Sequence, residues 1–390
     1  MRPKLGVLIK RSLTALTLAG ALALAGCSNG DDGSPRTTPS PVAPETSASA
    51  PQEAGPRTVT DHSDAQVEIP AEITGVAFEQ IPLVSTYVAY FDGEAPNIVA
   101  TSKGLVNMMD QTMLAEIAPE ALDVDTSFDN QGTINAETLL GLGPDVVFNN
   151  ARNKPNREAM EAAGLTVVGF DTMGAPTDTY VRWLRLLEDV FDEPGKNDAK
   201  IAYGDTLIND AEARAARVPD DQKRSAVVVM QAKQGMLVVA GGLDGWFTER
   251  WAETMNFVNV TTDSEEGAMP VNAEQLLAWD PDVILVTGRG MSSMTAAEIL
   301  NNEVEGIDLS TLRAVQNGEV YTTELGMWNW FTPGPDAPVV ANWIGSKLYP
   351  EEFEDVDLIS MTQDYYRQMY GHEVSAERAA TIVDPDAGLR

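Results

Sequence analysis

The sequence predicts an α/β protein built from two similar lobes that a long helix joins. Three observations predict this fold class. The chain has 390 residues, more than one hydrophobic core usually organises, so two domains are expected. One pattern occurs twice, as NAETLLGLGPDV at 135–146 and as NAEQLLAWDPDV at 272–283. Between the two copies, residues 199–218 have helical spacing and no Pro.

Each copy of the pattern predicts a short helix, a turn and a buried strand. Asn135 and Asn272 are candidate helix caps, and a Glu follows in the first turn, where a carboxylate suits the helix dipole. A Pro-Asp pair then ends the helix. The apolar runs at 146–148 and 283–286 are continuous, as in a parallel strand buried on both faces.

Further strands flank each copy, so that each lobe is Rossmann-like. They are expected at 97–100 and 165–170 in the first lobe, and at 226–230 and 318–323 in the second. Ligands of open α/β sheets bind outside the carboxyl ends of the strands. We therefore expect a ligand cleft between the lobes. The expected boundaries are 58–176 for the first lobe, 177–222 for the connecting helical backbone and 223–390 for the second lobe with its terminal helices.

The first 57 residues predict export and membrane attachment. A basic start and a short apolar run ending at Cys27, the only Cys of the chain, are typical of a signal peptide over 1–27. The ending LALAGC resembles the bacterial lipobox, in which that Cys is acylated; the alternative is a leftover thiol. Residues 28–57, rich in Ser, Thr, Pro and Ala, predict a disordered tether. We expect a lipid-anchored, extracytoplasmic, monomeric protein.

The charge balance limits the classes of partner. The chain has 26 Lys and Arg against 59 Asp and Glu, a formal net charge of −33. This excess argues against nucleic acid and against adsorption to anionic lipid.

The order of these motifs resembles the ABC-transporter substrate-binding lipoproteins of the helical-backbone type, which serve ferric siderophores, corrinoids and haem. The resemblance covers essentially the whole chain after the tether. Its residues are 58–70, both copies of the repeat, 312–335, 342–358 and 365–382. It implies the two-lobed fold, an ABC permease as partner, and no catalysis. It specifies the family better than the ligand.

The resemblance also gives the repeated glutamates a role. In this family a Glu on each lobe docks into arginine-lined pockets of the permease, and Glu137 and Glu274 match those positions. Two carboxylates on rigid helix starts suit bidentate recognition by Arg. The alternative is that both are only favourable first-turn residues.

Candidate ligand-binding residues follow the strand ends. They are the basic residues Lys103, Arg152, Lys233 and Arg289, and the aromatic residues Tyr87, Trp246, Trp328, Trp330 and Phe331. The basic set would form a positive patch suited to an anionic chelate, although each could be a solvated surface charge. The Trp328–Phe331 cluster stands beside a Pro/Gly turn, where the family places aromatic residues against the ligand; the alternative is that it is core.

The ligand classes differ in what they need from the protein. Only His62 and His372 are present, neither on an expected cleft loop, so an imidazole metal site is not expected. A ferric siderophore brings its own iron ligands and is the preferred prediction. A corrinoid stays open, and haem would need Tyr87 or Tyr90 as axial ligand. A molybdate-type oxyanion would leave the Trp cluster unexplained.

Two other classes of protein, an enzyme and a surface scaffold, fit the sequence less well than a transport protein. No nucleophile elbow, P-loop, zinc-protease helix or dinucleotide fingerprint is present, so no enzyme is predicted. A surface scaffold or adhesion lipoprotein would fit the anchor and tether, but it would leave the duplicated lobes without a purpose.

Overall fold

The computed structural model describes residues 55–79, 82–109, 112–130, 132–233, 235–288, 294–324 and 326–387. These residues belong to one unit, Glu53–Arg390. The predicted signal peptide, Cys27 and the tether up to residue 54 lie outside the described residues.

The first lobe is built on a parallel four-stranded sheet in the order β4-β3-β7-β8. Its strands are β3 (Val76–Phe78), β4 (Ile98–Thr101), β7 (Val146–Asn150) and β8 (Val167–Phe170). Val147 and Phe148 of β7 belong to different hydrophobic clusters, because alternate side chains point to opposite faces. The continuous apolar run of β7 thus matches a strand covered on both sides, as expected.

Two hairpins and short helices complete the first lobe. The hairpins are antiparallel and pair β1 (Arg57–Thr60) with β2 (Gln66–Ile69), and β5 (Asp129–Asn130) with β6 (Thr133–Ile134). The helices are α1 (Leu83–Tyr90), α2 (Lys103–Met109), α3 (Met113–Ile117), the 3-10 turn η1 (Pro119–Leu122), α4 (Ala136–Gly141) and α5 (Lys154–Ala162).

The joining segment contains two helices in succession. The Pro-free stretch forms α7 (Asp198–Ala215), and α6 (Pro176–Phe191) precedes it. α6 ends at Asp192, which is in the left-handed conformation with φ 56°. The aromatic and Leu side chains of α6 are buried in the core with those of α1, so α6 packs with the first lobe, whereas α7 packs along α12 (Ala337–Leu348). The 3-10 turn η2 (Asp220–Gln222) follows.

The second lobe has a larger mixed sheet in the order β12-β10-β9-β13-β14, with β11 also pairing with β9. Its strands are β9 (Ser225–Lys233), β10 (Met236–Ala240), β11 (Val258–Asn259), β12 (Ala268–Val271), β13 (Val283–Val286) and β14 (Val320–Thr322). β9, β13 and β14 are parallel, as expected, and the short strand β11, which was not predicted, is parallel to β9, while β10 and β12 are antiparallel additions.

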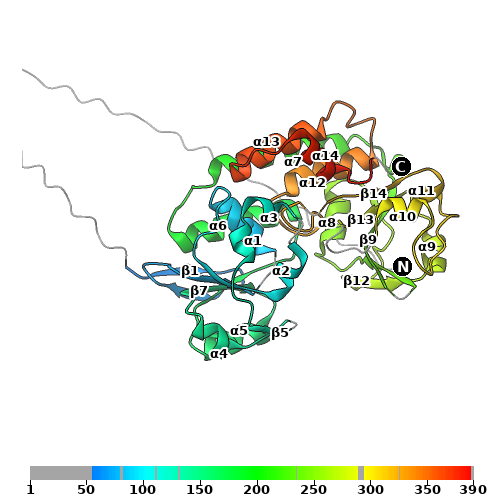
Figure 1. Ribbon diagram of the computed structural model, residues 1–390. Coiled ribbons are helices and arrows are strands. Elements are labelled where there is room, and N and C mark those ends of the chain that lie inside the picture. Colours follow the sequence, from blue (N-terminus) through cyan, green and yellow to red (C-terminus); the bar gives the residue numbers. More distant parts are fainter. Residues whose placement is uncertain are drawn as a thin grey trace, which may run out of the picture. The chain divides into compact units, whose positions relative to one another are not determined.

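The second lobe's remaining helices divide between its sheet and the C-terminal part. They are α8 (Phe247–Thr254), α9 (Ala273–Trp279), α10 (Ala296–Leu300), α11 (Arg313–Gln316), α13 (Leu358–Tyr370) and α14 (Ala376–Val383). Figure 1 shows α7, α12, α13 and α14 gathered along one side of the unit. α13 contacts both α12 and α14, so the C-terminal helices form one packed layer with α7.

The two lobes touch through loops that leave their sheets. The N–H of Gly174, after β8, donates to the carbonyl of Gly245, after β10, over 2.9 Å. On another side, the N–H of Met113 donates to the carbonyl of Gly326, also over 2.9 Å. These backbone contacts act together with α6, α7, the Arg378–Glu116 ion pair and one hydrophobic cluster that contains buried residues of both lobes.

Candidate functional site

The first lobe has a polar cavity of about 660 Å³ at the carboxyl ends of its strands, here called the N-lobe cavity. β3 and β4 end at its edge, because Glu79 directly follows β3 and Ser102 and Lys103 directly follow β4. This is the sheet edge at which ligands of α/β proteins bind. Its lining residues are Glu79, Ser102, Lys103, Gly104, Asn107, Asp129, Asn130, Gly132 and Ile134.

Hydrogen bonds hold both carboxylates of the N-lobe cavity in place. Glu79 accepts from the side-chain amides of Asn153 and Asn156 over 2.9 and 2.8 Å, and from the N–H of Asn150 over 3.0 Å. Asp129 accepts from the N–H of Lys103 over 3.0 Å. The Lys103 side chain, in contrast, is exposed and makes no ion pair with another described residue. Among the charged groups that line this cavity, Lys103 is therefore the one available to a ligand.

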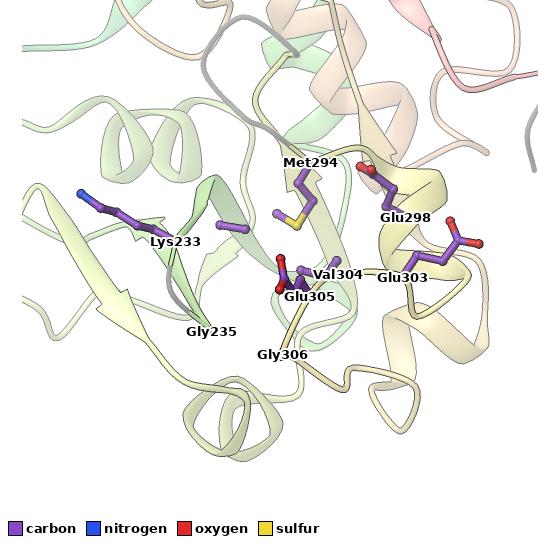
Figure 2. Close-up of a pocket in the computed structure, with 9 residues that line it drawn as sticks. Lys233, Gly235, Met294, Glu298, Glu303, Val304, Glu305 and Gly306 are labelled. Atoms are coloured by element: carbon purple, nitrogen blue, oxygen red, sulfur yellow. The ribbon is translucent and has the colours of Figure 1, made fainter.

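The second lobe has a comparable cavity of about 510 Å³, the C-lobe cavity. It lies where β9 ends at Lys233 and the chain turns at Gly235 into β10, beside α10. Figure 2 shows Lys233 on one side, and Glu298 and Glu303 on the opposite side. The remaining lining residues are Ala232, Gly235, Met294, Val304, Glu305 and Gly306.

One glutamate of the C-lobe cavity, Glu298, already has a structural role. Glu298 completes a capping box at the start of α10, where its carboxylate accepts from the N–H of Thr295 over 2.7 Å. The cavity also contains Glu303 and Glu305, so carboxylates outnumber Lys233 on its walls. The two cavities thus bring Lys103 and Lys233 to equivalent edges, but each Lys is accompanied by acids rather than by other basic residues.

Arg152 and Asp171 form an ion pair at the same edge of the first lobe. The Arg152 Nε lies 2.6 Å from Asp171 Oδ1, and the Arg152 side chain is 59% exposed. Burial acts to raise the pKa of Asp171, but the hydrogen bonds from Arg152 and the Met173 N–H, together with the charges of Arg152 and Arg182, outweigh it and the pKa is lowered. The positive charge of Arg152 is therefore already paired with a carboxylate of the protein. Arg289, the other predicted Arg, lies outside the described residues.

The predicted aromatic residues are mostly in the core. Trp328, Trp330 and Phe331 are all buried, and Trp330 and Phe331 both pack edge-on against Trp343 of α12. The cavity beside Trp328 and Trp330 measures only about 10 Å³. Trp246 is half-buried and precedes α8. The N-lobe and C-lobe cavities have no aromatic lining residue among the described ones.

The sequence predicts a strand over FEQIPLV at 78–84 with residues 85–87 in the loop after it, and this is wrong, because residues 85–87 lie in α1. The strand ends at Phe78, earlier than expected, and the helix follows it closely. Tyr87 is fully buried and its hydroxyl donates to the carbonyl of Pro96 over 2.7 Å, while Tyr90 donates to Glu193 over 2.6 Å. Burial raises the pKa of both Tyr87 and Tyr90. The hydrogen bonds that these hydroxyls donate and their raised pKa values both disfavour the tyrosinate that axial haem ligation would need.

The duplicated pattern has nearly the same contacts in both lobes. Asn135 and Asn272 cap α4 and α9, accepting from the N–H of Thr138 and Gln275 over 3.0 and 2.8 Å. The Asp of each Pro-Asp pair fixes the chain entering the neighbouring parallel strand. Asp145 accepts from the N–H of Thr74 over 2.7 Å, and Asp282 accepts from the N–H of Ser225 over 2.8 Å.

Glu137 and Glu274 stand apart from the other repeated polar residues. Both are exposed in the first turn of their helices. Neither makes a hydrogen bond or ion pair with the described part of the chain. The caps and strand contacts thus explain the repeated Asn and Asp, but they do not explain the repeated Glu.

Sequence reasoning missed Glu79, Asp129 and the acids of the C-lobe cavity. Glu79 had a usable signal, since it directly follows the apolar triplet 76–78, but that strand was placed too late in the chain. Asp129 lies in a two-residue strand that no periodicity can reveal. Within the described ranges, no group of three His, Cys, Asp or Glu could hold a metal ion. No described helix is long and apolar enough to cross a membrane.

Comparison with known proteins identifies the family. Residues 83–324 match the model of the periplasmic binding protein family, and the chain belongs to that family. The chain is 26% identical to the molybdate-binding protein MolA of Haemophilus influenzae over 83% of this chain and 93% of that protein. It is 22% identical to the Fe(3+)-citrate-binding protein YfmC of Bacillus subtilis over 65% of this chain and 76% of that protein.

A solved structure supports the same fold. A periplasmic solute-binding protein from Veillonella parvula superposes with a TM-score of 0.73 at 23% identity, over 85% of this chain and 98% of that one. The family resemblance and the two-lobed α/β fold are therefore confirmed. The protein is an extracytoplasmic solute-binding component of an ABC transporter. Its relatives differ in ligand, so the family alone does not name the solute.

Proposed function

We propose that this protein captures a small hydrophilic iron chelate, a ferric siderophore, and delivers it to the membrane permease of an ABC importer. One observation carries the proposal: each lobe has a polar cavity with one exposed Lys at the carboxyl edge of its sheet. Volumes of about 660 and 510 Å³ fall in the range of small-molecule sites, which is roughly 300–1,000 Å³. The two lysines would contact an anionic chelate from opposite lobes.

The lining of the cavities disfavours a corrinoid or haem. Such large, flat ligands need apolar and aromatic walls. The aromatic residues predicted for that purpose, Trp330 and Phe331, are buried in the core. The hydroxyls of Tyr87 and Tyr90 already donate hydrogen bonds to Pro96 and Glu193. A hydrophilic chelate that supplies all of its own iron ligands needs neither an aromatic wall nor a free Tyr hydroxyl.

A molybdate-type oxyanion is the second candidate. A molybdate-type oxyanion needs no aromatic wall, and the core position of Trp330 and Phe331 leaves no Trp cluster for the ligand to explain. The chain is also similar to a molybdate-binding protein over most of its length. An oxyanion would use only a small part of either cavity, which is why the chelate remains the first candidate.

Delivery would use the two lobes together with the N-terminal segment. Glu137 and Glu274 would dock into Arg pockets of the permease, one from each lobe. Acylated Cys27 and the tether would keep the protein near the membrane. A surface scaffold or adhesion protein, the alternative of another class, would need neither ligand binding nor docking.

The first experiment is a titration of the protein with ferric citrate, a ferric hydroxamate, a ferric catecholate, cobalamin, haemin and molybdate, followed by calorimetry. We expect saturable binding of one ferric chelate at micromolar or lower concentration. Saturation by molybdate alone would select the second candidate. Absence of binding to all six probes would contradict the solute-capture proposal and favour a scaffold.

A Lys variant tests the site itself. Lys103→Gln should weaken binding of the selected anion about tenfold or more, because a charge-assisted contact is lost. Lys154→Gln is the matched control, since Lys154 is also exposed in the first lobe but does not line the cavity. Equal affinities for both variants would place the ligand elsewhere.

A further inference from the structure

The exposed apolar residues of this protein coincide with its repeat. Among the described residues, the large hydrophobic side chains that are exposed are Leu140, Met236, Val258 and Leu277. Leu140 and Leu277 are 47% and 37% exposed, and they occupy the same position in the two copies of the pattern. Single exposed hydrophobic residues need no explanation. The same exposed Leu at equivalent positions in two lobes does require an explanation.

Each Leu shares a helix face with the unpaired Glu. Leu140 follows Glu137 by three positions in α4, and Leu277 follows Glu274 by three positions in α9. Residues three apart are neighbours on a helix surface. The preceding residues, Leu139 and Leu276, are buried and supply the core contact of each helix. The second Leu of each pair is thus not required for packing within its lobe.

We infer that Glu137 with Leu140, and Glu274 with Leu277, form two equivalent two-part contacts for the membrane permease. Each would place a carboxylate on a basic group of the permease and a Leu in an apolar recess beside it. The inference rests on the proposed docking function and adds the apolar half of that contact. The partner it fits is a protein that presents the same basic and apolar recess twice, because the two lobes offer the same pair twice.

The chemistry assigns the two halves different tasks. The Glu contact supplies attraction and orientation, and it weakens with salt because the charges begin in solvent. The Leu contact supplies apolar burial, which salt does not screen. The strong acidic excess of the chain offers many other carboxylates, and a Leu beside the Glu would distinguish the docking pair from them.

The test compares full-length variants binding to the permease complex in lipid nanodiscs, at low and at high salt. The variants are Leu140→Gln, Leu277→Gln, their combination, and the pair Glu137→Gln with Glu274→Gln. Val258→Thr is the control, because Val258 is equally exposed on the short strand β11, outside the repeat. Gln resembles Leu in helix propensity, so α4 and α9 should persist. Thermal unfolding of each variant checks this.

We expect each Leu variant to bind about five- to tenfold more weakly at both salt concentrations, with the two losses multiplying in the double variant. The Glu pair should lose more at low salt than at high salt, and the control should match wild type. Unchanged docking of the Leu double variant, with docking lost in the Glu pair, would overturn this inference and leave the proposed function intact. A wild-type protein that fails to bind the permease at all would overturn the docking function itself.

Discussion

Asp336 decides where the predicted aromatic residues lie. Its buried carboxylate accepts from the N–H of Met327, the indole of Trp330 and the hydroxyl of Tyr366 at one oxygen, over 2.9, 3.1 and 3.0 Å. The other oxygen accepts from Tyr370 over 2.8 Å. Two of these donors come from α13, distant in the sequence. No local pattern could reveal that partner, so sequence reasoning placed Trp330 against the ligand, with a core position as the alternative.

Removing that carboxylate should destabilise the second lobe. Asp336→Ala leaves buried N–H and hydroxyl donors without acceptors, which should cost about 3 kcal/mol of unfolding free energy. Asp336→Asn keeps one oxygen and should cost about 1 kcal/mol. Urea unfolding followed by Trp fluorescence measures both. Asp263→Ala, on an exposed residue, should leave the midpoint unchanged. Equal losses for Ala and Asn would contradict the role of the oxygen.

Among single residues, caps were the easiest to predict. Asn135 and Asn272 stand next to the helices they cap, and the structure confirms both. Tyr87 was misplaced because the strand before it is only three residues long. A segment that short gives no periodicity with which to separate strand from helix.

At the scale of elements, the repeat predicted more than any other feature. Helix, turn and buried strand all occur as expected in both copies. The antiparallel strands β10 and β12 were not predicted, because a hairpin on the edge of a parallel sheet leaves no trace in the duplicated pattern. The strand-fixing contacts of Asp145 and Asp282 also join segments far apart in sequence.

These two Asp contacts predict an acid-sensitive part of the stability. Hydrogen bonds from Thr74 lower the pKa of Asp145. For Asp282, burial acts to raise the pKa, but the hydrogen bonds from Ser225 together with the charges of Arg313 and Arg224 outweigh it. A carboxyl whose folded-state pKa is below its ordinary value of 3.8 adds stability above that pH and loses it as the pH falls through the folded-state pKa.

The variant Asp145→Asn with Asp282→Asn should therefore be less stable than wild type at neutral pH. The difference in melting temperature should narrow as the pH falls below 3.8, the ordinary Asp value. Melting curves from pH 7 down to pH 3 measure it, with Asp263→Asn as control. A difference that stays constant over this range would show that the Asp charge contributes nothing.

At the scale of the whole molecule, the family and the two-lobed plan could be predicted because they depend on the order of motifs along the chain. The joining helix α7 was visible in its spacing. The contact between the lobes was not, because Gly174 and Gly245 meet through backbone groups that carry no side-chain signal. Because the Gly174–Gly245 hydrogen bond joins the two lobes, it must break if the lobes separate at this point to admit a ligand.

A cross-link at this contact tests whether the lobes must separate widely when a ligand enters. A Cβ built on Gly245 lies 4.0 Å from the Cβ of Met173, within the range of about 3.5–4.5 Å that disulfides adopt. The pair Met173→Cys with Gly245→Cys, combined with Cys27→Ser, should therefore oxidise readily. Cys at position 245 must adopt φ near 78°, which costs about 1 kcal/mol of stability.

We expect the cross-linked protein to bind the solute selected by the titration with an association rate within about threefold of the reduced form. α6 and α7 together resist wide separation of the lobes, so a tether at their contact removes little motion that binding uses. Stopped-flow Trp fluorescence with and without reductant compares the two forms of one sample. A rate that falls a hundredfold on oxidation and recovers on reduction would mean that the lobes open widely before each capture, and that the Gly174–Gly245 contact belongs to the closed state alone.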